Sequence, residues 1–149
     1  MKNKELYDRT VSILVDAYMN DTLKHGSCYA CAVGNIIAAN MGIEYQHKQY
    51  WSGYDFPSWD NVFSTISSTK QQFISPINYS GDAKKQIDST GYSWQDLAKI
   101  EFAFEAASRE GDRMFNGLMA VIEVLDILHE NTDTTITTSS KQRFTKQLI

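Results

Sequence analysis

The fold of this chain is organised around HGSCYACAVGNIIAAN, residues 25–40, its least polar long run. Ser27 is a suitable N-cap, because its hydroxyl can accept a hydrogen bond from a backbone N–H in the first turn of a helix. The residues after it are apolar on almost every side, which is typical of a buried helix. We therefore predict a buried helix that begins at Cys28, ends near Gly42 and carries both cysteines of the chain on one face.

Three interpretations of the two cysteines, Cys28 and Cys31, remain open. In the first, both thiols are small buried apolar groups, as free cysteines commonly are. In the second, the helix N-terminus lowers the pKa of Cys28, which attacks a disulfide, and Cys31 then resolves the mixed disulfide. In the third, His25, Cys28 and Cys31 bind zinc or iron, and a fourth ligand comes from elsewhere in the chain. The only other histidines are His47 and His129.

The segment from Cys28 to Asn35 resembles a helical C-x-x-C-x-x-x-H motif. That motif belongs to the AhpD-like, carboxymuconolactone-decarboxylase-type family. The resemblance implies an all-helical fold and disulfide chemistry at the paired cysteines. It covers about eight residues, and Asn35 stands where the family has its histidine. The longer segment HGSCYACAVGN is similar to uncharacterised small proteins of Bacteroidetes-type bacteria and their phages, and this second resemblance implies no activity.

Composition excludes several classes of protein. A length of 149 residues favours one domain, and 42% apolar and 21% charged residues are ordinary for a globular chain. A net charge of −4 argues against a broad nucleic-acid-binding surface, which needs clustered Lys and Arg. Two cysteines three residues apart cannot staple a secreted fold. The first residues lack the apolar region of a signal peptide, and no run is long enough to span a membrane, so we expect a cytoplasmic protein.

Apolar residues recur with helical spacing along most of the remaining chain. The run Ser93-Trp94-Gln95-Asp96 is a capping box, in which the serine hydroxyl caps the helix that follows. The apolar face of the last helix is broad, which indicates a central position. The predicted helices besides that of the cysteines cover residues 3–23, 59–68, 82–89, 93–108 and 112–131.

An aromatic-rich segment follows the predicted cysteine helix. Irregular connections of this length tend to be functional or to pack on themselves. One interpretation is an exposed surface for a flat ligand or a protein partner. The other is a cover of core aromatics over the cysteine helix, which is the commoner use of such side chains. The residues that would form the surface are Tyr45, Tyr50, Trp51, Tyr54 and Trp59.

Asp126 and His129 have the i, i+3 spacing of carboxylate and histidine metal ligands in helical bundles, to which Glu101, Glu105 and Glu123 could add oxygens. A di-metal bundle repeats a Glu-x-x-His motif on two helices, however, and only one comparable pair is present here. We therefore interpret Asp126 as part of a solvated polar stripe opposite the apolar face. Its other members are Asp112, Asn116, Glu123 and Glu130.

Residues 132–149 differ in composition from the rest, being rich in threonine and basic. Phe144, Leu148 and Ile149 are candidate anchors of this tail, either on the body of the same chain or on a neighbouring subunit. A homo-oligomer formed through the tail is therefore a hypothesis. The sequence divides the chain into a helical domain, residues 1–131, and this C-terminal tail.

The sequence thus predicts an all-α protein, a compact bundle of five to six helices with an aromatic-rich loop and a C-terminal extension. As its function we expect a small cytoplasmic binding or interaction protein without catalytic activity or a cofactor, encoded by a phage or mobile element. Its partner would be a protein or a small flat ligand, contacted through residues 45–63, and no membrane. The alternatives are a thiol–disulfide redox protein using Cys28 and Cys31, and a zinc- or iron-binding protein using His25, Cys28 and Cys31.

Overall fold

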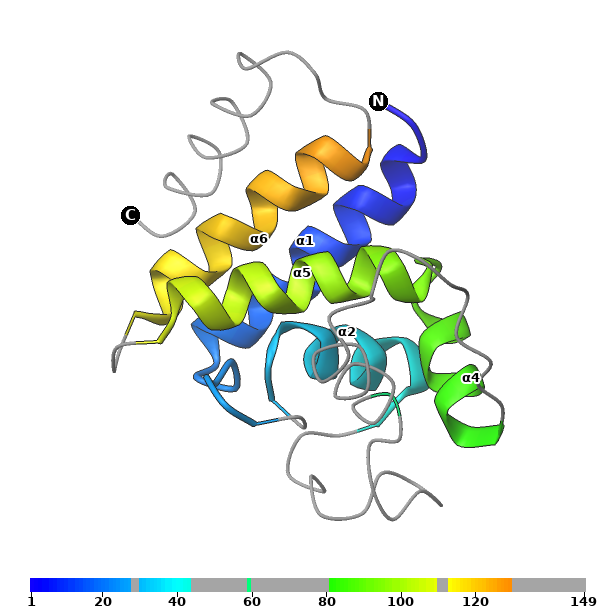
Figure 1. Ribbon diagram of the computed structural model, residues 1–149, viewed down its shortest axis with the longest axis horizontal. Coiled ribbons are helices and arrows are strands. Elements are labelled where there is room, and N and C mark those ends of the chain that lie inside the picture. The colour runs from blue at the N-terminus through cyan, green and yellow to red at the C-terminus, as the bar shows by residue number, and fades with distance from the viewer. Residues whose placement is uncertain (28–29, 44–58, 60–80, 110–112, 130–149) are drawn as a thin grey trace.

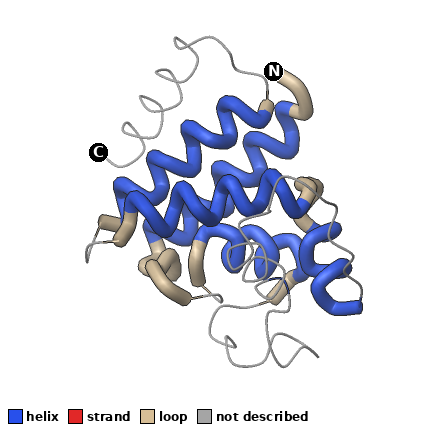
Figure 2. The backbone as a smooth tube through the Cα atoms, viewed as in Figure 1, coloured by secondary structure: helices blue, strands red, loops and turns tan. Residues whose placement is uncertain are grey.

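The computed structural model describes residues 1–27, 30–43, 59, 81–109 and 113–129. Within these residues every regular element is a helix, and loops and turns join the helices, as Figure 2 shows, so the predicted all-α class is confirmed. The helix predicted at residues 59–68, apart from Trp59, lies outside the described residues. The predicted aromatic-rich loop, again apart from Trp59, and the C-terminal extension lie outside them too. The helices are α1 (Lys4–Met19), α2 (Ala32–Met41), α4 (Gly81–Ser89), α5 (Trp94–Ala107) and α6 (Met114–Leu128).

Helices α1, α5 and α6 form the main body of the bundle (Figure 1). The contact between α5 and α6 is the most extensive one, and α6 also packs on α1. Helix α2 lies below these three in the view of Figure 1 and contacts α1, α5 and the short helix α4. Helix α2 is apolar and contacts three neighbouring helices, so its buried residues lie at the centre of the core. The fully buried large side chains of the core include Leu14, Ile36, Ile37, Leu97, Ile100, Phe104 and Leu118.

The start of the cysteine helix differs from the prediction. Helix α2 begins at Ala32 with Cys31 as its N-cap, and Cys28 lies outside the described residues. Ser27 starts the turn before the helix through its carbonyl oxygen, which accepts hydrogen bonds from the N–H groups of Ala30 (3.1 Å) and Cys31 (2.7 Å). The predicted end at Gly42 is confirmed, since Gly42 adopts the left-handed conformation typical of a helix C-terminus.

Helix α1 ends four residues earlier than predicted, at Met19. Asp21 has a φ of 59°, a left-handed conformation that stops helical propagation. The N–H of Thr22 then turns back to the carbonyl oxygen of Ala17, at 2.8 Å. The chain therefore leaves α1 early, and residues 20–31 become the connection that carries His25 to the start of α2.

The capping box at Ser93 is confirmed, because the Ser93 hydroxyl accepts a hydrogen bond from the N–H of Asp96 at 3.1 Å. Replacing Ser93 by alanine removes this acceptor from an exposed helix start. We expect Ser93→Ala to lower the free energy of unfolding by about 1 kcal/mol, which urea denaturation can measure. Ser93→Asp is the matched control, since aspartate caps equally well; an alanine variant as stable as the wild type would contradict the prediction.

The interpretation of Asp126 as a solvated residue is wrong. Asp126 is fully buried, and the Tyr7 hydroxyl donates a hydrogen bond to its Oδ1 at 2.7 Å. Helix α6 packs on α5 with its apolar face and on α1 with the side that carries Asp126. Asn116 is exposed and Glu123 is half-buried, so these two members of the predicted stripe face outward at least in part. Asp112 and Glu130 lie outside the described residues.

Trp59, which was predicted as part of a contact surface, lies in the core. It is fully buried, and its backbone N–H donates to the Gln86 side-chain oxygen at 2.9 Å. We therefore remove Trp59 from the predicted contact surface, because a residue in the core cannot meet a partner. The other members of that surface, Tyr45, Tyr50, Trp51 and Tyr54, lie outside the described residues. None of the helices in the described ranges is both long and apolar enough to cross a bilayer.

Candidate functional site

A cluster of polar side chains lies where the start of α2 meets the end of α5. Cys31 is fully buried there, and its Sγ accepts a hydrogen bond from the Gly34 N–H at 3.3 Å. The first N–H groups of a helix have no partner within the helix and favour negative charge. The start of α2 is therefore suited to stabilise a thiolate or a carboxylate beside Cys31.

Helix α5 contributes two carboxylates, one turn apart, to this cluster. Glu101 accepts a hydrogen bond from the Val33 N–H at 3.4 Å. Glu105 accepts from the Gly26 N–H, at 3.3 Å and 3.1 Å to its two oxygens. The Cys31 Sγ and one oxygen of each glutamate lie within 4.8 Å of one another. Residues four apart on a helix point in the same direction, so both carboxylates reach the start of α2 together.

His25 completes the cluster from the connection that precedes α2. Its Nδ1 lies 2.8 Å from a Glu105 carboxylate oxygen and 3.0 Å from the Ser108 hydroxyl oxygen. Ser108 donates its one hydroxyl hydrogen to the Phe104 carbonyl oxygen at 2.6 Å, so it must accept from His25. We therefore assign the proton of the neutral ring to Nδ1. The Nε2 lone pair then has no partner among the described residues, and the side chain is 34% exposed.

Burial and crowding of negative charge shift the pKa values of two groups in the cluster. Burial raises the pKa of the Cys31 thiol well above its usual value, and the neighbouring Glu101 raises it further. Burial, followed by the charge of Glu105, raises the pKa of Glu101 to about 8. In the metal-free protein at neutral pH, Cys31 is therefore a thiol and Glu101 holds a proton.

The sequence identified only part of this cluster. It predicted His25 and Cys31 as neighbours, and the structure joins them through Glu105. Cys28, the third predicted ligand, lies outside the described residues. The sequence considered Glu101 and Glu105 as further oxygen ligands beside Asp126 and His129 and set that metal site aside; in the described part of the chain the two glutamates cluster with Cys31 instead. The sequence signal that could have identified Glu101 and Glu105 is their spacing of four residues within an otherwise apolar run.

His129 belongs to a separate buried network at the far end of α6. Its Nδ1 lies 2.6 Å from the Lys2 carbonyl oxygen, and its Nε2 lies 2.8 Å from the Tyr92 hydroxyl. The Tyr92 hydroxyl also lies 3.1 Å from the Thr10 hydroxyl, and burial raises the pKa of Tyr92 to about 12. The network ties the N-terminal residues to α6, and this accounts for His129 in structural terms. His47 lies outside the described residues.

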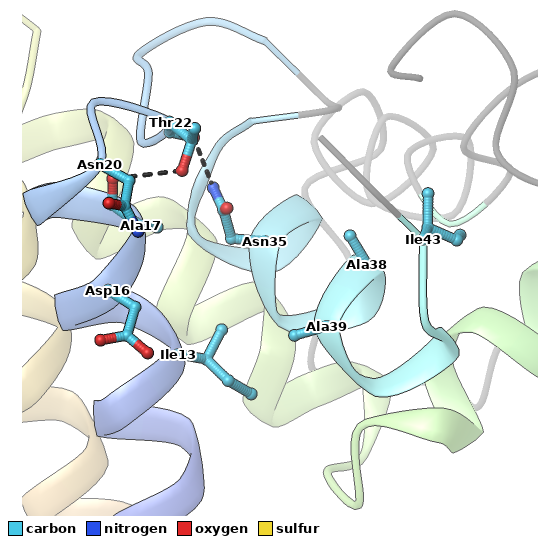
Figure 3. A pocket seen from close by; sticks show the side chains of 9 residues that line it. All are labelled: Ile13, Asp16, Ala17, Asn20, Thr22, Asn35, Ala38, Ala39 and Ile43. Carbon is cyan, nitrogen blue, oxygen red and sulfur yellow. Dashed lines mark hydrogen bonds between the residues drawn. The ribbon is translucent and has the colours of Figure 1, made fainter. Parts of the chain in front are cut away.

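A cavity of about 180 Å³ opens between α1 and α2 (Figure 3). Asp16 and Asn20 line it from the side of α1, and Asn35 lines it from α2. None of the four side chains of the cluster, those of His25, Cys31, Glu101 and Glu105, lines this cavity. The apolar part of its wall is formed by Ile13, Ala17, Ala38, Ala39 and Ile43.

No family model, no curated protein and no solved structure matches this chain. The functional argument therefore rests on the described side chains. The resemblance to the AhpD-like motif stays a prediction. At the position where that family has a histidine, the amide nitrogen of Asn35 contacts backbone carbonyl oxygens, among them that of Cys31 at 3.0 Å.

The raised pKa of Glu101 predicts how the stability of the metal-free protein depends on pH. The carboxyl pKa rises from 4.5 in the unfolded chain to about 8 in the folded protein, so the folded state binds more protons between these values. Stability should therefore fall as pH rises from 4.5 to 8, by at most about 1.4 kcal/mol per pH unit for this one proton. Urea denaturation in a chelator at several pH values measures this slope. Glu101→Gln should flatten it, and an unchanged slope would contradict the prediction.

Proposed function

We propose that this protein binds a divalent transition-metal ion, with zinc as the best fit, through Cys31, Glu101, Glu105 and His25. Zinc is commonly bound by thiolate, imidazole and carboxylate groups in fourfold coordination. A mixed set that includes a thiolate disfavours Mg²⁺ and Ca²⁺, which prefer oxygen ligands alone. His25 would bind through Nδ1 after the ring proton moves from Nδ1 to Nε2, since Nδ1 already lies 2.8 Å from a Glu105 oxygen.

The observation that carries the proposal is the convergence of one thiol and two carboxyl groups within 4.8 Å at a buried helix start. Among the described residues, no Lys or Arg forms an ion pair with Glu101 or Glu105, and the His25 ring is the one basic side chain in contact with Glu105. Without a metal, the cluster avoids like-charge repulsion by keeping protons on Glu101 and Cys31. A divalent cation would replace these two protons and compensate the negative charges that the Glu101 carboxylate and the Cys31 thiolate then carry.

The direct test is a zinc titration of metal-free protein that was purified without nickel chromatography. We expect binding of one zinc ion per chain, with release of protons to the buffer because the ligands must be deprotonated. Magnesium at the same concentration should neither bind nor compete. A folded protein that takes up no zinc above background would overturn the proposal.

A second candidate function is thiol–disulfide exchange, and the position of Glu101 next to Cys31 is the observation that favours it. In this scheme Cys28 forms a mixed disulfide with a substrate disulfide and displaces one substrate thiolate. Where Glu101 is ionised, which its pKa of about 8 places at mildly alkaline pH, its carboxylate takes the proton of the Cys31 thiol, and the Cys31 thiolate attacks the Cys28 sulfur. A Cys28–Cys31 disulfide forms and the second substrate thiolate leaves. Mass spectrometry after oxidation by a small disulfide would detect that bond, and zinc loading should prevent it.

The predicted role as an interaction protein is compatible with metal binding and stays a prediction. It depends on Tyr45, Tyr50, Trp51 and Tyr54, all of which lie outside the described residues. Trp51→Ala would separate the two roles, because it should weaken a protein or flat-ligand contact and leave zinc affinity unchanged.

A further inference from the structure

One side chain, Asn35 in the first turn of α2, contacts three backbone carbonyl groups with a single nitrogen atom. Its Nδ2 lies 2.8 Å from the Ala30 oxygen and 3.0 Å from the oxygens of Thr22 and Cys31. Figure 3 shows the contact with Thr22. The amide nitrogen has two hydrogens, so one of them is shared between two of these oxygens. The Asn35 amide thus joins the end of the α1 connection to the residues that start α2.

These three carbonyls lie on two segments of the connection between α1 and α2. One segment, residues 22–24, leads to His25, and the other, residues 30–31, leads into α2; we call these segments the two stems of the loop. The Lys24 N–H donates to the Ala30 oxygen at 2.8 Å, so the residue before His25 lies next to the residue before Cys31. His25 follows one stem directly, and Cys31 follows the other. The Asn35 amide spans both stems, so it sets the distance from the His25 ring to the Cys31 thiol.

From this geometry we propose that Asn35 is a positioning residue of the metal site. It binds no metal itself. It holds the stems so that His25 and Cys31 reach the same point in front of Glu101 and Glu105. The proposal rests on the metal site proposed above. No other side chain fits as well: aspartate has the same shape but no N–H donor, and glutamine places its amide one methylene farther from the helix.

Removing the amide should alter the site while leaving the fold in place. Asn35→Ala leaves the Thr22 carbonyl oxygen without this donor, whereas the Ala30 oxygen keeps the Lys24 N–H and the Cys31 oxygen keeps the backbone N–H of residue 35. Thr22 and Asn35 line the cavity of about 180 Å³ between α1 and α2, and that cavity is open at the surface. Water can therefore reach the freed Thr22 carbonyl and replace part of the lost hydrogen bonding.

The matched control is Asn40→Ala on the same helix. The Asn40 Nδ2 also donates to a backbone carbonyl, that of Ile36 at 2.8 Å, but it contacts neither stem of the loop. In metal-free protein, hydrogen exchange at the Lys24 and Cys31 amides should become faster in Asn35→Ala and stay unchanged in Asn40→Ala. The dissociation constant for zinc should rise by about 10- to 100-fold in Asn35→Ala, the usual effect of losing a group that orients metal ligands. It should stay within about twofold of wild type in Asn40→Ala.

The outcomes separate this inference from the proposed function. If the wild type binds no zinc, the metal site itself is wrong, and the exchange data then report only on the loop. If the wild type binds zinc and Asn35→Ala binds it equally well, the positioning role is overturned. If Asn35→Ala does not fold, Asn35→Ser takes its place, since the hydroxyl keeps one donor, and the same comparison of zinc affinities decides.

Discussion

Replacing Cys31 by serine is expected to lower the affinity for zinc by at least about a hundredfold while the protein stays folded. The hydroxyl oxygen is a far weaker zinc ligand than a thiolate. The fold should persist because residue 31 is the N-cap of α2, where its side chain accepts a hydrogen bond from the Gly34 N–H, and serine is among the preferred N-cap residues. Zinc titration and circular dichroism on the same sample give the two readouts.

Glu123→Gln is the control for that experiment, because it removes a negative charge from α6 outside the cluster. It should bind zinc like the wild type. Equal zinc affinity in Cys31→Ser and the wild type would show that the thiol is not a ligand and would leave the two glutamates without the sulfur donor that favours zinc. The same titration on Cys28→Ser tests the predicted ligand that lies outside the described residues.

Replacing Gly117 by alanine is expected to destabilise the protein by about 1–3 kcal/mol. In an ordinary helix this change stabilises by up to about 1 kcal/mol, because alanine has the higher helix propensity. In α6, however, a Cβ at residue 117 would lie 2.8 Å and 2.9 Å from two ring carbons of Phe104 and 3.0 Å from the Cβ of Ser108. Both neighbours are fully buried, Phe104 in α5 and Ser108 at its C-cap, so moving them away would disturb the packing around them.

Asn116→Ala is the matched control, since Asn116 is exposed on the same helix. It should change the free energy of unfolding by no more than about 0.5 kcal/mol, and helix propensity favours a small gain. Urea denaturation of the three proteins measures both effects. A Gly117→Ala variant more stable than the wild type would mean that α5 and α6 pack less closely than the structure shows.

The helices that the sequence predicted best are those with strong local signals. Ser93 caps α5 as its capping box indicates, and α6 buries apolar residues of its predicted broad apolar face and packs on α5 and α1. Errors arose where one local signal competed with another. Ser27 looked like the cap of the cysteine helix, but it contributes its carbonyl oxygen to a turn and Cys31 is the cap.

The sequence also misjudged Asp126 and left the place of Trp59 open, because burial depends on distant elements. Asp126 has the spacing of a solvated stripe, yet Tyr7, 119 residues away, covers it and donates to its Oδ1. Trp59 could have lined a surface, but Gln86 binds its backbone inside the core.

For this protein the sequence by itself determined the helical class, the Ser93 cap of α5, the end of α2 at Gly42 and the candidate ligands His25 and Cys31, because periodicity and capping are local properties of the chain. Only the tertiary structure decided that Glu101 and Glu105 join them. Those contacts span 68 and 79 residues, to the N–H groups of Val33 and Gly26. They exist because α5 packs against the start of α2, where unpaired N–H groups attract carboxylates.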